Sequence, residues 1–169
     1  MTAPTDLTSA GATPPPRAVT RFLERARTLG LDPEVRTFPA GTRTAADAAA
    51  AIGCDVAAIV KSLVFIADGR AVLALTSGAN RADEAALAAA IGASSLRKAD
   101  ADEVRTATGY AIGGTPPFGH DTPLPVACDR DLTALDEVWA AAGTPSTVFP
   151  LTPAQLLTAT GARVAVFGT

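Results

Sequence analysis

The stretch IVKSLVFIADGRAVLALT occupies residues 59–76 and contains two apolar runs, residues 59–67 and 70–76, joined by Asp68 and Gly69. Apolar runs of this length are typical of buried strands. Asp-Gly between two such runs is a strong signal for a two-residue hairpin turn. The stretch therefore predicts an antiparallel hairpin whose first strand carries apolar residues on both faces.

Apolar residues at helical spacing, capping residues and terminal glycines predict five helices around this hairpin. The helices cover residues 17–30, 44–53, 83–92, 101–109 and 152–161. Further strands are predicted at residues 35–38, 95–97, 125–128, 137–141, 147–149 and 163–167, with a loop at 39–43. Hairpins alternate with helices and no βαβ unit repeats. This order favours an α+β domain, with a mixed, mainly antiparallel sheet flanked by helices, over a Rossmann fold.

Length and composition agree with one domain. The chain has 169 residues, 48% of them apolar, which is enough for one substantial core. Residues 1–16 are rich in Thr, Ala and Pro and are predicted to be a disordered lead-in, and residues 17–169 form the predicted domain. The lead-in has no apolar signal-peptide core, and no apolar run approaches the ~18 residues of a membrane helix. These features favour a cytoplasmic protein.

The charge balance restricts the classes of partner. The formal net charge is −3, and only 5% of the residues are aromatic. A general nucleic-acid coat protein would be strongly basic, and a protein that stacks single-stranded bases would contain more aromatic side chains. Both classes are therefore disfavoured.

The sequence lacks the familiar catalytic and metal-binding motifs. Cys54 and Cys128 have neither metal-type nor redox-type spacing, and we expect both to be buried small hydrophobic residues. There is no Gly-x-Ser-x-Gly nucleophile elbow and no His-Glu-x-x-His zinc helix. We therefore expect no metal and no cofactor, and no Ser-His-Asp triad can be assembled from the sequence. Asp129 and Asp131 are predicted to cap or turn the chain after a strand.

Lysine is rare in this sequence. Twelve of the fourteen basic residues are arginine, and lysine occurs only at positions 61 and 98. Because the two cations are not interchangeable, a retained lysine hints at a specific need. Lys61 stands inside the first apolar run, where an unpartnered ammonium would be costly. Two interpretations are open: it binds an anionic or carbonyl oxygen at the mouth of a pocket, or its stem reaches the sheet edge.

Residues 109–120 differ in character from the rest of the chain. Four glycines and two prolines in twelve residues predict a loop of fixed shape. Gly113 and Gly114 would let the backbone approach a ligand and direct amide N–H groups at an oxygen. The alternative is a purely structural turn. His120, the only histidine, directly follows this loop and is open to the same two interpretations.

Three arginines lie four residues apart in the first predicted helix. Arg17, Arg21 and Arg25 therefore share one face of that helix. Such a stripe either contacts a phosphate backbone or is a solvated face. It is the best candidate for a phosphate contact in this sequence.

Two motifs resemble a known family. The strand residues Val60-Lys61-Ser62-Leu63 are similar to the Val-Lys-Thr/Ser-Leu strand of the YbaK/EbsC group of aminoacyl-tRNA editing domains. Gly109-Tyr110, Gly113-Gly114 and Pro117 resemble the Gly-Tyr-x-x-Gly-Gly-x-x-Pro loop of that group. The resemblance extends over about residues 19–167.

The resemblance implies an α+β editing domain that hydrolyses the ester of mischarged tRNA, such as Cys or Ala on tRNA for proline. Lys61 would anchor the terminal adenosine or the ester, and Gly113 and Gly114 would supply backbone donors near the carbonyl. The other substrate-binding residues would be Tyr110, Thr115, Pro117 and His120, the last as a pocket wall or a water positioner. Family members lack a protein nucleophile, so water or a substrate group attacks.

The implied partners are the acceptor end of mischarged tRNA and a synthetase such as prolyl-tRNA synthetase. On this resemblance the stripe of Arg17, Arg21 and Arg25 would be the tRNA-binding surface. Two other hypotheses stay open at this point. The domain could be a noncatalytic module that binds an aminoacyl-adenosine or a nucleotide, or a regulatory interaction domain without a small ligand. An open apolar cleft with Lys61 and the loop amides converging on it favours the enzyme.

Overall fold

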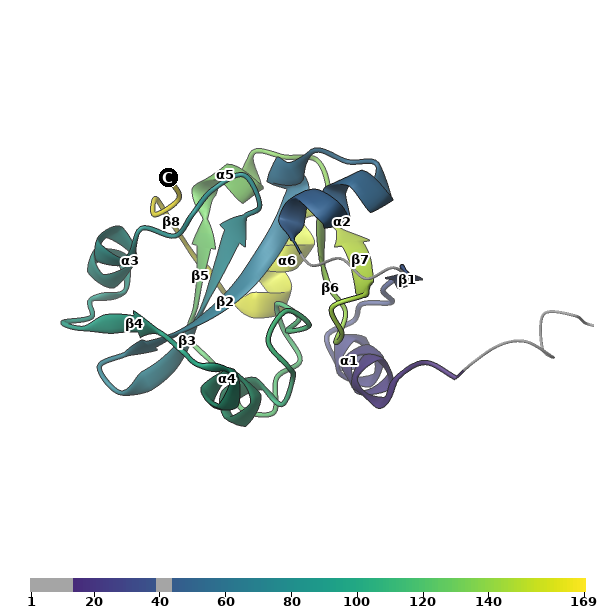
Figure 1. Ribbon diagram of the computed structural model, residues 1–169, viewed down its shortest axis with the longest axis horizontal. Helices are drawn as coiled ribbons and strands as arrows, with labels where there is room; N and C mark the ends of the chain where they lie inside the picture. The colour runs from purple at the N-terminus through teal and green to yellow at the C-terminus, as the bar shows by residue number, and fades with distance from the viewer. Residues whose placement is uncertain (1–13, 39–43) are drawn as a thin grey trace, which may run out of the picture.

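The computed structural model describes residues 14–38 and 44–169, which form an eight-stranded sheet with helices around it (Figure 1). The strands are β1 (Arg36–Thr37), β2 (Ile59–Ala67), β3 (Arg70–Ser77), β4 (Leu96–Lys98), β5 (Val126–Asp129), β6 (Val138–Ala141), β7 (Thr147–Leu151) and β8 (Arg163–Ala165). The helices are α1 (Arg17–Thr28), α2 (Ala45–Ile52), α3 (Glu84–Ile91), α4 (Ala101–Thr108), α5 (Arg130–Thr133) and α6 (Pro153–Thr160), with a 3₁₀ turn η1 (Val56–Ala58).

The sheet has the order β1-β7-β6-β2-β3-β5-β8, and β4 also pairs with β2. Antiparallel pairing joins β2 to β3 and β4, and β7 to β1 and β6. Parallel pairing joins β2 to β6, and β5 to β3 and β8. The predicted α+β fold with a mixed, mainly antiparallel sheet is confirmed.

The predicted hairpin is formed by β2 and β3. Ala67 pairs with Arg70, and the two residues between them, Asp68 and Gly69, have positive φ of 48° and 82°. Positive φ at both central positions is what a type I′ hairpin turn requires, and Asp-Gly supplies it at low cost. The turn thereby fixes the register of the whole hairpin, and through it the face on which each side chain of β2 lies.

Helices pack on both faces of the sheet, so both faces of β2 contribute to the core. On one face the sheet packs against helix residues Phe22, Ala26, Leu132 and Leu156. On the other face, Phe65 packs with Leu87 of α3, and Ile59 packs with α2. In Figure 1, α6 lies behind the sheet and α2 in front of it.

Local capping explains why the helices begin and end where they do. Thr44, Asp83, Asp100 and Thr152 each accept a hydrogen bond from a backbone N–H in the first turn of the following helix. Left-handed glycines end the same four helices. The caps at Thr44 and Thr152 were predicted. The four-residue helix α5 was not, because it is too short for helical periodicity, but its cap Asp129 confirms the role expected for that residue.

Some predictions lie outside the described residues. These are most of the N-terminal lead-in, residues 1–13, and the loop at residues 39–43. The predicted helix start at Arg17 is confirmed. Among the helices of the described segments, none is both long enough and apolar enough to cross a membrane.

The first turn of α4 predicts an acid-sensitive contribution to stability. Glu103 accepts two hydrogen bonds from Arg97 (both 2.8 Å) and one from the Asp100 N–H (3.0 Å). These contacts, the Arg97 bonds first, lower the pKa of Glu103 from 4.5 to about 2. Because the charged form is favoured in the folded state, its contribution is complete above pH about 4.5 and is lost as pH falls toward 2.

Thermal unfolding of Glu103→Gln at several pH values tests this expectation. The melting temperature of the variant should lie below that of the wild type at pH 6, and the two should converge toward pH 2. Glu34→Gln is the control, because Glu34 is exposed and forms no ion pair within residues 14–38 and 44–169. A constant difference between wild type and Glu103→Gln across this range would contradict the assignment.

Candidate active site

The sheet is interrupted along one edge of β2. On that edge β6 pairs only with Ile59 and Val60, and β4 pairs only with residues 65–67. The Gly78 N–H donates to the Ile59 carbonyl (2.7 Å), so the backbone groups of Ile59 point toward β3. Because backbone groups alternate in direction along a strand, odd-numbered residues of β2 bond to β3, and the backbone groups of even-numbered residues point to the interrupted edge. Ser62 therefore presents its backbone N–H and C=O to the gap, where neither β4 nor β6 pairs with it.

A cleft of about 960 Å³ opens at this gap. Its walls come from α2, β2, β4, α4, the 109–120 loop, β6 and the segment 145–148. The volume lies within the range of small-molecule sites. Segments far apart in the sequence thus converge on the one place where β2 lacks a neighbouring strand.

Lys61 lies on the wall of this cleft. On its face of β2, Ile59 packs against α2 and Phe65 packs with α3, so the lysine stands between the two helices. Its Nζ donates a hydrogen bond to the backbone carbonyl of Asn80. An ammonium has three donors, so two remain for a ligand. Of the two interpretations made from the sequence, the position in the cleft agrees with the pocket role.

Asn80, whose carbonyl accepts the hydrogen bond from Lys61, is itself held in place. The Asn80 side-chain amide donates to Asp129 (2.9 Å) and to Asp131 (2.8 Å). Asp129 is buried and also accepts from the backbone N–H groups of Ser77 (3.1 Å) and Asp131 (3.0 Å). This network fixes the loop after β3, and with it the anchor of the Lys61 ammonium.

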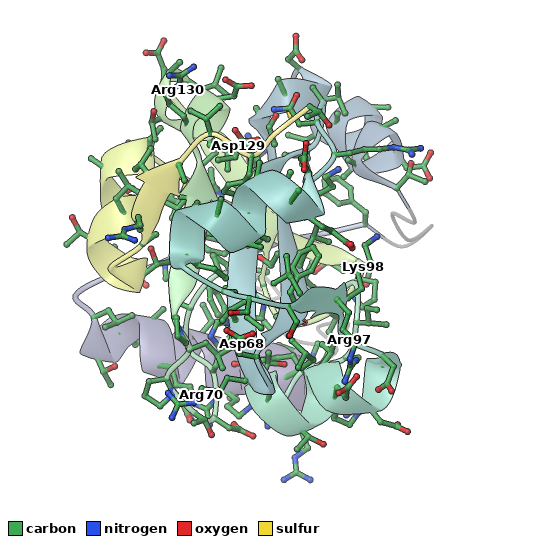
Figure 2. The ribbon with its side chains drawn as sticks, turned by 90° about the vertical axis from the view of Figure 1, so that its left-hand side faces the viewer. Asp68, Arg70, Arg97, Lys98, Asp129 and Arg130 are labelled. Atoms are coloured by element: carbon green, nitrogen blue, oxygen red, sulfur yellow. The ribbon has the colours of Figure 1, made fainter. Side chains whose placement is uncertain are left out.

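Lys98 is a site residue that the sequence analysis did not assign. It extends from β4, beside Arg97 (Figure 2), and lines the same cleft. Burial lowers the pKa of Lys61, and the neighbouring charges of Lys98 and Arg81 lower it further. The scarcity of lysine in the sequence was a signal that could have identified Lys98. Both lysines of this arginine-rich chain line the same cleft.

The two loop glycines have different environments. Gly113 lines the cleft at a φ of 84°, and no residue of the described segments accepts a hydrogen bond from its backbone N–H. The Gly114 N–H instead donates to the Ala111 carbonyl (3.0 Å) within the loop. The expectation that Gly114 offers a backbone donor to the substrate is therefore corrected. A glycine is needed there because a Cβ would lie only 2.7 Å from the Cα of Thr144.

Of the other loop residues predicted to bind substrate, only Thr115 lines the cleft. Its hydroxyl donates to the Ala111 carbonyl (3.2 Å). Tyr110 and Pro117 are buried away from the lining and support the loop. The expectation that His120 forms a wall of the pocket is likewise corrected, because His120 is not among the residues that line the cleft. Its Nε2 lies 2.7 Å from the Pro116 carbonyl oxygen, and its ring lies edge-to-face with the Tyr110 ring. Burial lowers the pKa of His120, which favours the neutral ring.

The arginine stripe of α1 is divided in its contacts. Arg17 is exposed and has no partner within the described residues. Arg21 donates to the Gly109 carbonyl, and Arg25 donates to the Gly119 carbonyl (2.7 Å) and pairs with Asp121 (2.7 Å). Arg21 and Arg25 therefore do not form the freely solvated face that was the alternative to a phosphate contact. Both are occupied by the loop.

The side chains that line the cleft include two cations but, among the described residues, no nucleophile paired with a general base. Its lining contains Lys61 and Lys98, and within the described segments it contains no Asp, Glu, His or Cys. Cys128 is fully buried, and burial raises its pKa to about 12; Cys54 is half-buried and its pKa is also raised by burial. Across residues 14–38 and 44–169, no group of three or more metal-ligating side chains is present. The cleft can therefore bind anions and polarise a carbonyl with N–H donors.

A comparison with known protein families identifies the fold. The model of the aminoacyl-tRNA editing domain matches residues 39–159, which include β2, the loop and the whole lining of the cleft. This chain belongs to that family. The expected resemblance is confirmed, and the matched residues include the site and the strands β2 to β7.

Relatives of this editing domain occur both within synthetases and as separate proteins. The proline–tRNA ligase of Solidesulfovibrio magneticus is 37% identical over 100 residues, which are 59% of this chain and 17% of the ligase. The chain thus spans about one sixth of the length of such a relative. The uncharacterised protein YwhH of Bacillus subtilis is 31% identical over 73% of this chain and 78% of its own.

A solved structure is similar over nearly its full length. It is the crystal structure of a candidate trans-editing enzyme for prolyl tRNA synthetase, with a TM-score of 0.88 and 46% sequence identity. The alignment covers 93% of this chain and 99% of that one. This chain therefore shares the fold of that structure over nearly all of its length.

The close approach of the loop to the turn at residues 143–144 predicts a strict need for glycine at position 114. Gly114→Ala places a Cβ 2.7 Å from Thr144 Cα and 2.8 Å from its carbonyl carbon, so backbone has to move. We expect a loss of roughly 1–3 kcal/mol in the free energy of unfolding. Chemical denaturation measures it.

Gly113→Asn is the matched control. Asparagine tolerates positive φ, and a Cβ at Gly113 meets nothing closer than 3.8 Å. Its loss should stay below about 1 kcal/mol. Equal stability of the Gly114→Ala variant and the wild type would show that the packing against Thr144 is not required.

Proposed function

We propose that this protein is a trans-editing hydrolase that deacylates mischarged aminoacyl-tRNA, with tRNA for proline carrying Cys, Ala or a similar small amino acid as its substrate. The observation that carries the proposal is the position of Lys61: a half-buried ammonium on the wall of a cleft that contains no acidic side chain within the described residues. Membership of the editing-domain family and the similarity to a candidate trans-editing enzyme support the reaction class.

The charges of the cleft suit the 3′ end of tRNA. The whole chain is acidic, with a net charge of −3, yet the cleft contains two cations. Lys98 is the more exposed of the two and is suited to a backbone phosphate. Lys61 lies deeper and has two donors left for the ester or ribose oxygens. Exposed Arg17 is the remaining member of the α1 stripe for a contact with the acceptor stem.

The proposed reaction needs no protein nucleophile. Water, or a hydroxyl group of the substrate, adds to the ester carbonyl carbon, and the negative charge collects on the carbonyl oxygen. The N–H groups of Gly113 and Ser62 and the Lys61 ammonium are the donors available to that oxygen. The ester C–O bond then breaks, the ribose oxygen takes a proton, and free amino acid and tRNA are released.

The choice of tRNA is part of the proposal. All tRNAs end in the same CCA sequence, so a cleft that holds only this end does not distinguish them. The proline–tRNA ligase relatives point to tRNA for proline, with identity supplied by acceptor-stem contacts or by prolyl-tRNA synthetase as a partner. We expect the protein to act in the cytoplasm, where this substrate is made.

Deacylation assays with tRNA for proline carrying Cys, Ala, Ser, Thr or Pro test the proposal. The wild type should hydrolyse at least one mischarged substrate and spare the Pro ester. Lys61→Met keeps an apolar stem and removes the ammonium, so we expect turnover to fall by roughly 10²–10³. The variant should melt no lower than the wild type, because it removes a half-buried charge.

Lys61→Arg separates charge from shape. Its larger fork donates in other directions, so activity should also be lost although the charge is kept. Full activity of Lys61→Met would overturn the proposed role of the ammonium. Tight binding of an aminoacyl-adenosine without hydrolysis of any ester would identify a noncatalytic binding module instead.

Lys98 should affect both salt dependence and pH dependence. Lys98→Gln should raise KM and reduce the salt slope by about 1, as for one lost phosphate contact. It also removes a positive charge that lowers the pKa of Lys61, so that pKa should rise toward its ordinary value of 10.5. If the ammonium is the active form, the alkaline fall in activity moves to higher pH.

The control for this prediction is Arg70→Gln, an exposed cation at the β2–β3 turn outside the cleft. Rates are corrected for spontaneous ester hydrolysis in alkaline buffer. An unchanged salt slope and an unchanged alkaline limb in Lys98→Gln would contradict the assigned contact.

A further inference from the structure

Helix α1 holds both ends of the loop that borders the cleft. At one end the Arg21 guanidinium donates to the Gly109 carbonyl and lies over the Tyr110 ring, 4.5 Å from its centroid. At the other end Arg25 donates to the Gly119 carbonyl (2.7 Å) and pairs with Asp121 (2.7 Å). Two side chains one helical turn apart thus fix the two points where the loop enters and leaves.

The neck of the loop is also closed on itself. The Tyr110 hydroxyl donates to the Gly119 carbonyl (3.0 Å), so this carbonyl receives donors from both Tyr110 and Arg25. The Asp121 N–H donates to the Thr108 carbonyl (3.0 Å). Because the neck is closed, a shift at either arginine is transmitted to the tip, where Gly113 lines the cleft.

The helix is a firm support for these contacts. The adjoining face of the helix is buried through Val19, Phe22 and Ala26. The Phe22 ring packs against Phe118 of the loop, with centroids 5.4 Å apart, and against Phe149 of β7 at 4.8 Å. The helix is therefore anchored in the core, and its arginines meet the loop from a fixed position.

We propose that Arg21 and Arg25 are positioning residues for the editing reaction: they act through the loop carbonyls and hold the Gly113 N–H at the mouth of the cleft. This inference rests on the proposed deacylase function. Charged donors form strong hydrogen bonds to carbonyl oxygens, and the fork of Arg25 contacts a carbonyl and a carboxylate at once. The two arginines do not touch the substrate, so their loss should lower turnover more than binding.

The experiment compares Arg21→Gln, Arg25→Gln and the double variant with the control Arg27→Gln. Arg27 lies on the same helix and carries the same charge, but it is exposed, and its side chain forms no hydrogen bond or ion pair within the described residues. We expect kcat of the double variant to fall by about 10²-fold, because displacing a catalytic group by about 1 Å has an effect of this size. The KM of the double variant should stay within about twofold of the wild-type value. Arg27→Gln should match the wild type.

Two further measurements separate positioning from phosphate binding and from general stability. Hydrogen exchange of the amides at residues 110–119 should accelerate in Arg21→Gln and Arg25→Gln and not in Arg27→Gln. Arg25→Lys keeps the charge but not the fork, and it should restore the melting temperature more fully than kcat. Assays are run well below the melting temperature of each variant.

The outcomes are distinct. A rise in KM with a reduced salt slope and unchanged kcat would show that the two arginines contact tRNA, and it would overturn the inference. Unchanged loop exchange in Arg21→Gln and Arg25→Gln would overturn it as well. If the wild type deacylates none of the substrates, the proposed function fails, and loop exchange still decides whether the two arginines hold the loop.

Discussion

The structure depends on an incomplete pairing of one strand. β2 lies in the middle of the sheet, but on the edge away from β3 it is shared between β6 at its start and β4 at its end. The gap exposes the Ser62 backbone and admits a cleft between helices that elsewhere cover the sheet. An unpaired backbone group inside a fold is costly unless a ligand or water satisfies it. The same feature that weakens the sheet therefore creates the cleft.

The cation in the cleft is held by a chain of polar contacts that leads away from the site. Lys61 bonds to the Asn80 carbonyl, and Asn80 is held by Asp129 and Asp131. Burial makes the Lys61 ammonium less stable than in water, and nearby cations add to this. Such a group gains free energy when an anionic or carbonyl oxygen binds to it, which is the property an editing site needs.

The opposite wall of the cleft is a loop whose shape is imposed from several sides. Gly114 lets it lie against the turn at residues 143–144, while Arg21 and Arg25 fix its ends from α1. Donors held in place before the substrate arrives stabilise developing charge without a further cost of reorganisation. The N-terminal helix lies outside the region that matches the family model, yet it supports the loop within that region.

The sequence by itself determined the features that depend on near neighbours. The hairpin followed from Asp68-Gly69 between two apolar runs, and the caps at Thr44 and Thr152 from residues three positions apart. Lys61 was identifiable because a charge inside an apolar strand is costly wherever that strand lies. The family followed from two short motifs, and the fold class followed from the family.

The tertiary structure decided the features that depend on distant segments. That β4 and β6 share one edge of β2 follows from long-range pairing, which no local pattern encodes. The same holds for Lys98 joining Lys61, for His120 turning to the Pro116 carbonyl, and for the Gly114 N–H being used inside the loop. Helical spacing placed Arg17, Arg21 and Arg25 on one face, but only the packing of α1 against the loop could show that two of them bind carbonyls. Periodicity determines the direction of a side chain, whereas its partner is set by whichever segment packs there.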